Sequence, residues 1–373
     1  MKILYLSQLP LSETIIKRWG MEDIANHKIE WEYFDIGNLL RNDYQRDVIL
    51  HHKEKIIQNL EELKEILQNQ KKFICISLVN LYIESYPLYM ILKKLGVYTA
   101  YYDWGHLPTI NDNIFKKIYS KNIIYLIKQI VFIVKKKIFL KFKYDLIFQA
   151  GSISNLSKIS KKIIPINYAD IESYIDAGQG KNFEYILFLD SNICDHQDTL
   201  ESEFKINKDL YLMQVNKYFS ILEGLLKKRI IIAAHPTSKY CSNDFYGREI
   251  FYNKTAKLVR DSFLVISHQS TSVAFPILYK KKIIFLGLRV MKKLKIDNPI
   301  NIMMSLSKKL KTEFVYADDI NKEEDINLST QFSINNSAYD KFIYDYLSVL
   351  GPNFPRNMDI ILPTLLKVLM EKK

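Results

Sequence analysis

The sequence predicts an α/β protein of two domains, each built around a parallel β-sheet. Short apolar runs of the length of buried strands alternate with stretches of helical spacing, which is the pattern of strands joined by crossover helices. The chain has 373 residues, more than one hydrophobic core usually serves. The apolar periodicity lapses over residues 168–183, which contain two glycines, so we place the domain boundary there.

The first domain is predicted to cover residues 1–175. Strands are expected at residues 2–7, 29–35, 73–79, 98–102 and 145–149, and helices at residues 46–70 and 84–95. The fourth of these strands ends in the turn Asp103-Trp104-Gly105-His106. Asp103 and His106 are candidate ligand-binding residues because they follow a strand end, although a tight turn capped by the aspartate has the same sequence.

Residues 114–143 form a basic segment within this domain. It has nine lysines and no acidic residue, with apolar and aromatic side chains between the lysines. This composition predicts an amphipathic helix attracted to an anionic membrane surface, although a core helix with a solvated basic face has the same pattern. No signal peptide occurs, nor a stretch of about 18 uncharged apolar residues. We therefore expect a cytoplasmic chain that associates peripherally with a membrane.

The second domain, residues 176–350, is expected to begin with a strand at residues 184–189. The loop that follows, residues 190–198, holds three aspartates and a histidine. Carboxylates at a strand exit are suited to acid/base chemistry. Asp190, directly at the strand end, is the first candidate for a catalytic residue and Asp195 is the second. The alternative is a solvated, acid-rich turn.

Polar clusters also end the next two expected strands, residues 230–234 and 263–266. The first cluster is His235-Pro236, in which the proline biases the histidine backbone toward an extended conformation. The second, residues 267–272 (Ser-His-Gln-Ser-Thr-Ser), precedes a helical pattern, and hydroxyl and backbone N–H groups at a helix start favour an anion. Either cluster alone is more typical of a capped helix or a satisfied histidine. Because ligands of open parallel sheets bind outside the carboxyl ends of the strands, the two together predict a phosphate site.

The His-Pro pair followed by the Ser/Thr cluster resembles the motifs of bacterial sialyltransferases and Kdo transferases. These are GT-B glycosyltransferases of surface-polysaccharide synthesis that use CMP-activated sugars. Residues 188–198 also resemble the opening of the C-terminal domain in surface-carbohydrate biosynthesis proteins, and the resemblance covers about residues 180–290. It implies the GT-B fold: two Rossmann-like domains with a cleft between them, and a C-terminal helix in residues 351–373 that packs back on the N-terminal domain.

The resemblance also implies an activity. A CMP-activated ulosonic sugar, such as Kdo or a sialic-like nonulosonate, would be transferred to a surface glycan or lipid-linked acceptor at the inner membrane, without a metal or cofactor. Asp190 or Asp195 would act as a base or as a nucleophile, and His235 would stabilise the departing phosphate. Asp103 and His106 would bind the acceptor. The expected phosphate-binding residues are His235, Pro236, Lys239, Ser267, Ser270, Thr271 and Ser272.

Two alternative interpretations stay open. A CDP-glycerol-type polymer transferase has a similar His-Pro motif and Ser-rich helix start. A non-enzymatic nucleic-acid-binding protein is suggested by the net charge of +12 and the 25 tyrosines. Against it, the charge gathers in one segment and no RRM, KH or zinc-finger pattern occurs, so we expect no nucleic-acid partner. The chain also has no dinucleotide-binding glycine motif and no Walker-type loop, and its three scattered cysteines indicate neither a disulfide framework nor a zinc site.

Overall fold

The structure is a computed structural model. It describes residues 2–40, 49–105, 108, 131, 134, 142–153, 159–180, 183–195, 204–294, 299–326 and 334–371. The predicted basic helix, residues 114–143, lies outside the described residues except for four positions, and so does the candidate acceptor residue His106.

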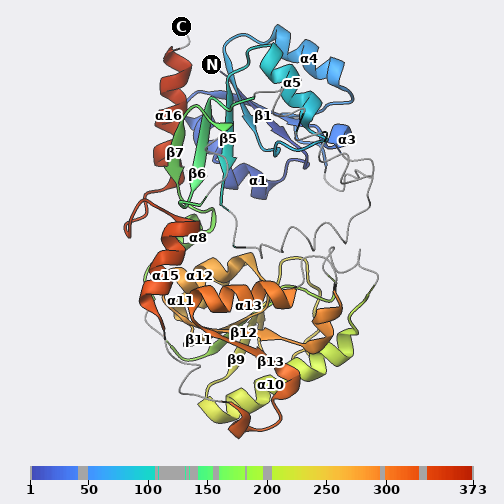
Figure 1. The fold of residues 1–373 in the computed structure, drawn as a ribbon, viewed down its shortest axis with the longest axis vertical. Coiled ribbons are helices and arrows are strands. Elements are labelled where there is room, and N and C mark those ends of the chain that lie inside the picture. Colours follow the sequence, from blue (N-terminus) through green and yellow to red (C-terminus); the bar gives the residue numbers. More distant parts are fainter. Residues whose placement is uncertain are drawn as a thin grey trace. The chain divides into compact units, whose positions relative to one another are not determined.

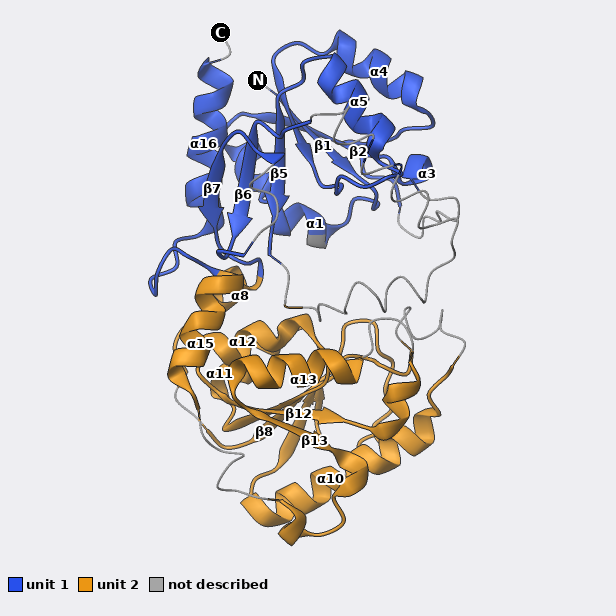
Figure 2. Ribbon diagram, viewed as in Figure 1, with its two compact units in different colours: residues 1–105, 111–169, 348–373 blue, residues 106–110, 170–347 orange. Residues whose placement is uncertain are grey.

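The chain divides into two compact units (Figure 2). Unit 1 comprises residues 1–105, 111–169 and 348–373, and unit 2 comprises residues 106–110 and 170–347. The chain therefore completes most of unit 1, builds unit 2, and returns to unit 1 with its last segment. That segment contains α16 (Asn357–Glu371), which packs beside the last strand of the unit 1 sheet (Figure 1).

Unit 1 is a parallel sheet in the strand order β3-β2-β1-β4-β5-β6-β7. Its strands are β1 (Lys2–Ser7), β2 (Glu30–Asp35), β3 (Glu54–Ile56), β4 (Phe73–Ser77), β5 (Thr99–Asp103), β6 (Leu146–Ala150) and β7 (Ile163–Ile166). Its other helices are α1 (Glu13–Arg18), α2 (Met21–Asn26), α3 (Gly37–Leu40), α4 (Leu60–Asn69) and α5 (Tyr86–Lys94). Apolar side chains of α4 and α5 form one core with alternate residues of the central strands, such as Leu4 and Leu6 of β1, because successive strand side chains point to opposite faces.

Unit 2 repeats this arrangement in the strand order β10-β9-β8-β11-β12-β13. Its strands are β8 (Ile186–Leu189), β9 (Ile230–Ala233), β10 (Ile250–Phe251), β11 (Leu264–Ser267), β12 (Lys282–Gly287) and β13 (Glu313–Tyr316). Its α-helices are α8 (Asp170–Ala177), α10 (Lys208–Leu226), α11 (Thr255–Asp261), α12 (Ala274–Leu278), α13 (Pro299–Leu310) and α15 (Asn336–Phe342). In each unit the first strand lies between the second and the fourth, which is the doubly wound order of Rossmann folds.

One local prediction was wrong. Residues 46–70 do not form one long helix. Within them β3 pairs with β2 as the edge strand of the sheet, and α4 begins only after Asn59, whose side chain accepts the Glu62 N–H as an N-cap. The segment 168–183, where the apolar periodicity lapses, contains the short helix α8, which buries Ile171 and Ala177.

A buried asparagine pair fastens the returning segment to unit 1. The Asn167 N–H donates to Asn357 Oδ1 at 2.7 Å, and Asn357 Nδ2 donates to the Asn167 carbonyl at 3.0 Å. The Asn167 amide also donates to the Pro355 carbonyl at 2.6 Å and accepts from the Ser348 hydroxyl at 2.6 Å. Next to this network, a Cβ at Gly20 would lie 2.3 Å from the sulfur of Met358. The first turn of α16 is therefore in close contact with the start of α2.

Substituting Asn167 by alanine is expected to lower the free energy of unfolding of unit 1 by about 2 kcal/mol, because a buried hydroxyl and a carbonyl lose their partners. All three tryptophans lie in unit 1, so tryptophan fluorescence during urea denaturation measures this unit alone. Asn26→Ala, an exposed position in the same unit, should leave the midpoint nearly unchanged. Equal midpoints for the two variants would contradict a fastening role for Asn167.

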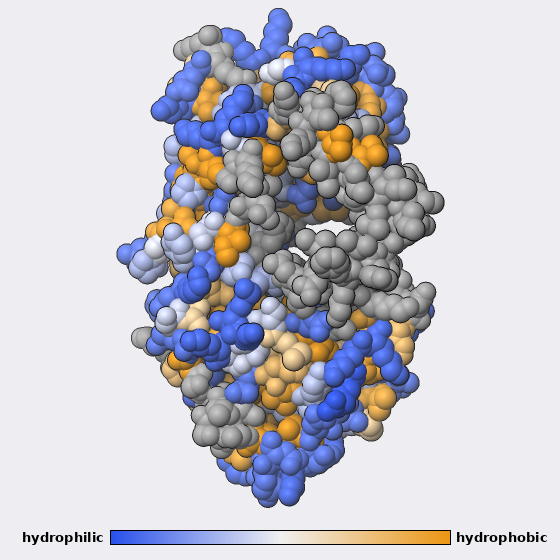
Figure 3. Space-filling view, in the orientation of Figure 1, coloured by the Kyte–Doolittle hydropathy of each residue, from blue (hydrophilic) through white to orange (hydrophobic). Residues whose placement is uncertain are grey.

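The surface is mostly hydrophilic on the face shown in Figure 3, and its apolar residues gather in small groups. Exposed large apolar side chains on described helices include Leu210 and Met213 of α10 and Met304 of α13. Among the described residues, no helix combines the length and apolar character needed to cross a membrane.

Candidate functional site

The strand ends that carry the predicted polar clusters are neighbours in the unit 2 sheet. Leu189 of β8 pairs with Ala233 of β9 on one side and with Ser267 of β11 on the other. The chain passes from β8 outward to β10 and then crosses to β11 on the other side of β8. The carboxyl ends of β8 and β11 therefore flank the point where the strand order reverses, which is where doubly wound sheets bind ligands.

Asp190 joins the loops that follow β8 and β9. Its carboxylate is 4% exposed and accepts three hydrogen bonds. The Asn192 N–H and the Tyr240 hydroxyl donate to Oδ1 at 2.9 and 3.1 Å, and the His235 N–H donates to Oδ2 at 3.1 Å. Burial raises the pKa of Asp190, and these hydrogen bonds oppose that shift. In this geometry Asp190 holds the backbone of His235 in place.

The imidazole of His235 is oriented by Thr237. The Thr237 N–H donates to Nδ1 at 3.3 Å, and the Thr237 hydroxyl lies 2.8 Å from the same nitrogen. Because Nδ1 accepts, the neutral ring carries its proton on Nε2. Asn192 Nδ2 in turn donates to the Thr237 hydroxyl at 3.4 Å. The loops thus present a half-buried histidine with a defined N–H donor at the strand end, as an anion-binding role requires.

Part of the Ser/Thr cluster is used inside the fold. Ser267 is fully buried, and its hydroxyl donates to the His268 carbonyl at 2.7 Å. The His268 side chain is also fully buried: Nδ1 donates to the Leu286 carbonyl and Nε2 accepts from the Tyr211 hydroxyl at 2.8 Å. Burial lowers the pKa of His268 to about 4, so this histidine is a neutral core residue.

The rest of the cluster forms the turn before α12. The Ser270 side chain accepts the Ser272 N–H at 3.2 Å and so caps a short 3₁₀ turn, Thr271–Val273. Thr271 is exposed and Ser272 is half-buried. Of the side chains expected to bind phosphate, those of Ser267 and Ser270 already have partners within the protein, whereas Thr271 is an exposed residue.

Comparisons with known proteins identify the architecture. No known protein-family profile matches the chain, and no curated protein matches its sequence. MurG of Acinetobacter baumannii is similar in structure, with 10% identity and a TM-score of 0.51 over 98% of this chain and 99% of that chain. A variant of the wall teichoic acid polymerase TagF has 10% identity and a TM-score of 0.51 over 100% of this chain and 89% of that chain. The fold is GT-B.

The GT-B fold confirms the predicted class of two parallel-sheet domains with a helix returning to the first. Sequence inspection gave no individual role to three residues at the strand ends of unit 2. Asn192 and Thr237 make the contacts described above, and the buried Ser191 hydroxyl has no partner. One signal was available in the sequence: asparagine adopts the left-handed backbone conformation more readily than most residues, and Asn192 has φ +51° in the loop after β8.

The other predicted residues of unit 2 lie in the same two loops. Pro236 and Lys239 are exposed on the loop after β9. Asp195 is exposed on the loop after β8, with Lys208 Nζ 3.9 Å from its carboxylate. Asp195 thus reaches solvent whereas Asp190 does not. A catalytic role for Asp190, Asp195 or His235 stays a prediction.

In the GT-B first unit, Asp103 lies at the carboxyl end of β5 and is 4% exposed. Its Oδ1 accepts the Gly105 N–H at 3.3 Å, which forms an Asx turn. His106, its expected partner in acceptor binding, lies outside the described residues.

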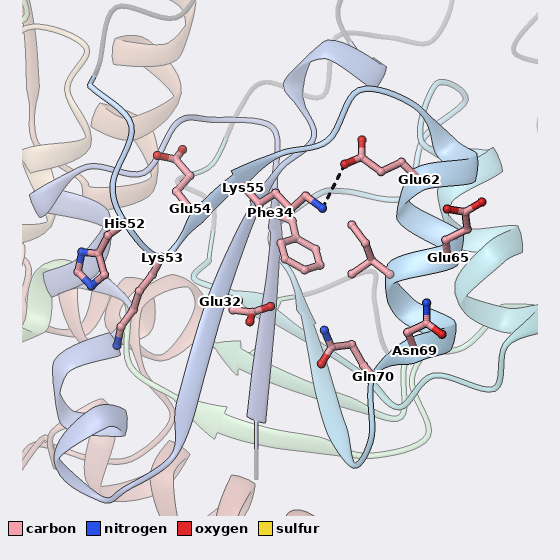
Figure 4. A pocket seen from close by; sticks show the side chains of 11 residues that line it. Glu32, Phe34, His52, Lys53, Glu54, Lys55, Glu62, Glu65, Asn69 and Gln70 are labelled. Carbon is pink, nitrogen blue, oxygen red and sulfur yellow. Dashed lines mark ion pairs between the residues drawn. The ribbon is translucent and has the colours of Figure 1, made fainter.

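A cavity of about 550 Å³ in unit 1 lies between β3 and α4 (Figure 4). Its charged lining residues are Glu32, Glu54, Glu62, Glu65, Lys53 and Lys55. Four carboxylates outnumber two ammonium groups, and Lys55 is paired with Glu62 at 3.2 Å. A backbone hydrogen bond from Gln58 lowers the pKa of Glu62, which keeps that carboxylate charged. The lining repels anions, so we do not place a phosphate ligand there.

Proposed function

We propose that the chain is a glycosyltransferase whose unit 2 binds the nucleotide-activated donor. The observation that carries the proposal is the orientation of His235 at the carboxyl end of β9. Thr237 bonds its Nδ1, which leaves Nε2–H as the donor, and Asp190 accepts its backbone N–H. The unpartnered Ser191 hydroxyl at the end of β8 and the exposed Thr271 beyond β11 add donors at neighbouring strand ends. Such an array of donors is suited to a phosphate group.

In the proposed reaction, His235 stabilises the charge that builds on the departing phosphate, which is electrostatic catalysis by a preorganised donor. Asp190 positions His235. Asp195, the exposed carboxylate, is then the better candidate for activating the acceptor hydroxyl or attacking the anomeric carbon. We propose that the transfer needs no bound metal or cofactor.

For the donor we propose a CMP-activated ulosonic sugar, on the His-Pro and Ser/Thr motifs of the sequence. The acceptor would be a surface glycan or a lipid-linked glycan at the inner membrane, with residues 114–143 attracted to the anionic lipid. A CDP-glycerol-type polymer transferase is the second candidate, because one of the similar structures is a wall teichoic acid polymerase. Both candidates use a cytidine nucleotide and differ in the group that is transferred.

Thermal unfolding with nucleotides tests the donor site. CMP at about 100 times its Kd is expected to raise the melting temperature of unit 2 by about 5 to 10 °C, since a ligand that binds only the folded state stabilises it. UDP and GDP should have little effect. His235→Ala should abolish the CMP response, and His27→Ala, an exposed histidine of unit 1, should keep it.

Other outcomes of this experiment separate the alternatives. A response to CDP and not to CMP favours the CDP-glycerol-type transferase. A response to UDP or GDP instead would overturn the cytidine assignment and leave a GT-B transferase. No response to any nucleotide, together with DNA binding that weakens steeply with salt, would favour a nucleic-acid-binding protein.

A further inference from the structure

Three aromatic side chains form a cluster at the carboxyl end of β5 in unit 1. Tyr102 belongs to β5, Trp104 follows that strand, and Trp19 follows α1. The rings of Tyr102 and Trp104 are stacked with centroids 5.4 Å apart. The Trp19 ring lies 4.9 Å from that of Tyr102 and 5.3 Å from that of Trp104, tilted by 53° and 74°. Both tryptophans are half-buried, so the cluster reaches the surface.

Polar atoms without partners are buried in the same place. The Tyr102 hydroxyl and the Trp104 Nε1–H make no hydrogen bond, and the Tyr102 side chain is only 3% exposed. The hydroxyl of Tyr5, a fully buried β1 residue, is unpaired as well. Burial, followed by the proximity of Tyr102, raises the pKa of Tyr5 well above its usual range, so both hydroxyls stay protonated donors. Buried donors without acceptors are rare in native proteins and call for a partner.

The chemistry of this cluster selects the class of ligand. A stacking ligand must offer an apolar face to the indole rings and hydrogen-bond acceptors to the unpaired donors. The stacked rings of Tyr102 and Trp104 have centroids only 5.4 Å apart, so no slot exists between them for a planar base. A pyranose has a C–H face on one side and hydroxyl and ring oxygens around its edge, and it stacks on a single indole. The donors have no exposed surface, so binding requires movement of Trp104, next to which Gly105 (φ +81°) allows the backbone to turn.

We propose that Trp19, Tyr102 and Trp104 form a carbohydrate-binding site in unit 1. In the proposed glycosyltransferase this site holds a sugar ring of the acceptor glycan, so the acceptor is a glycan rather than a bare lipid or polyol. The binding site itself stands on the geometry of unit 1, and only its role as the acceptor site rests on the proposed function.

Tryptophan fluorescence tests the site in the full-length chain. The chain has three tryptophans, and Trp31 is buried elsewhere in unit 1, so Trp31→Phe leaves a signal from the cluster alone. Methyl β-galactoside, methyl β-N-acetylglucosaminide and lactose are titrated into this variant, with glycerol as the polyol control. At least one sugar is expected to change the emission saturably, whereas glycerol at equal concentration should not.

Two variants in the Trp31→Phe background test the assignment. Trp104→Ala should weaken sugar binding at least tenfold, as measured by the emission of the remaining Trp19. Tyr102→Phe should weaken sugar binding about three- to tenfold through loss of one hydrogen bond. Melting temperatures of both variants are measured to confirm folding, and an unfolded Trp104→Ala is replaced by Trp104→Phe. An emission unchanged by every sugar, or equal affinity in the folded variants, would overturn the site and leave buried water as the partner of the hydroxyls.

His235→Ala separates this proposal from the nucleotide site. The sugar response should persist in that variant while the CMP response is lost. If the wild-type chain does not respond to CMP, the nucleotide site is refuted and the carbohydrate site is unaffected. If it does not respond to any sugar, the carbohydrate site is refuted and the nucleotide site is unaffected.

Discussion

Asp190→Asn is expected to lower the free energy of unfolding of unit 2 by about 2–4 kcal/mol and to weaken nucleotide binding at the same time. The carboxylate accepts from backbone N–H groups on both oxygens, from Asn192 on Oδ1 and from His235 on Oδ2. An amide has only one acceptor oxygen. In either orientation of the new side chain, its NH₂ group faces a backbone N–H, so one buried donor loses its partner and the turn that carries His235 is displaced.

Calorimetry measures the unfolding of both units and should show the change in the unit 2 transition only. Asp195→Asn is the matched control: this side chain is exposed, so its loss should shift stability by less than about 0.5 kcal/mol. If Asp195 is the acid/base residue, the same variant loses transfer activity at unchanged stability. Wild-type stability and CMP affinity in Asp190→Asn would refute the positioning role.

Acidification is expected to remove about 3 kcal/mol of stability from unit 2 through His268 alone. Burial lowers the pKa of His268 from 6.5 to about 4, whereas the unfolded chain keeps the ordinary value. Between pH 6.5 and pH 4 the unfolded state therefore binds a proton at His268, whereas the folded state does not. The contribution is fully present above pH 6.5 and is lost as the pH falls toward 4, at about 1.4 kcal/mol for each pH unit.

The difference between wild type and His268→Gln isolates this effect, because glutamine does not titrate. Urea denaturation at pH 4, 5, 6 and 7 should show the variant less stable at pH 7, with a difference that shrinks at each lower pH. Tyrosine circular dichroism reports both units, and tryptophan fluorescence identifies the transition of unit 1, since all three tryptophans lie there. A difference that stays constant over the four pH values would show that folding does not shift the pKa of His268, and a difference that grows as the pH falls would show that the buried ring is protonated in the folded state.

The strands of both sheets were largely predictable from short apolar runs, because strands buried on both faces need continuous apolar sequence. The exceptions are edge strands. β3 is a three-residue edge strand whose sequence, Glu-Lys-Ile, has a charged majority and is compatible with helix. β7 contains Pro165, which a central strand would exclude but an edge strand tolerates since one side needs no N–H. Edge positions follow from sheet order, which only the assembled fold defines.

The placement of Asp190 and His235 at neighbouring strand ends was also predictable, because both residues follow strands and parallel strands end at one edge. Their roles were not. The Tyr240 hydroxyl donates to Asp190 from 50 positions further along the chain, and two backbone N–H groups donate to the same carboxylate, contacts that the sequence does not reveal. Likewise, His268 and Ser267 look like ligand-binding residues in sequence, but both are fully buried and bonded to their surroundings.

The pairing of Asn167 with Asn357 has a consequence for the order of folding during synthesis. Residues 1–169 leave the ribosome first. The side chain of Asn357, which bonds the backbone of Asn167, is synthesised only after all of unit 2. All strands of unit 2 have been synthesised by residue 316, so unit 2 can fold while unit 1 still lacks the returning segment that bonds Asn167. A chain that ends at residue 347 would contain all of unit 2 but lack the last segment of unit 1. Premature termination is therefore expected to destabilise unit 1, the unit that is translated first.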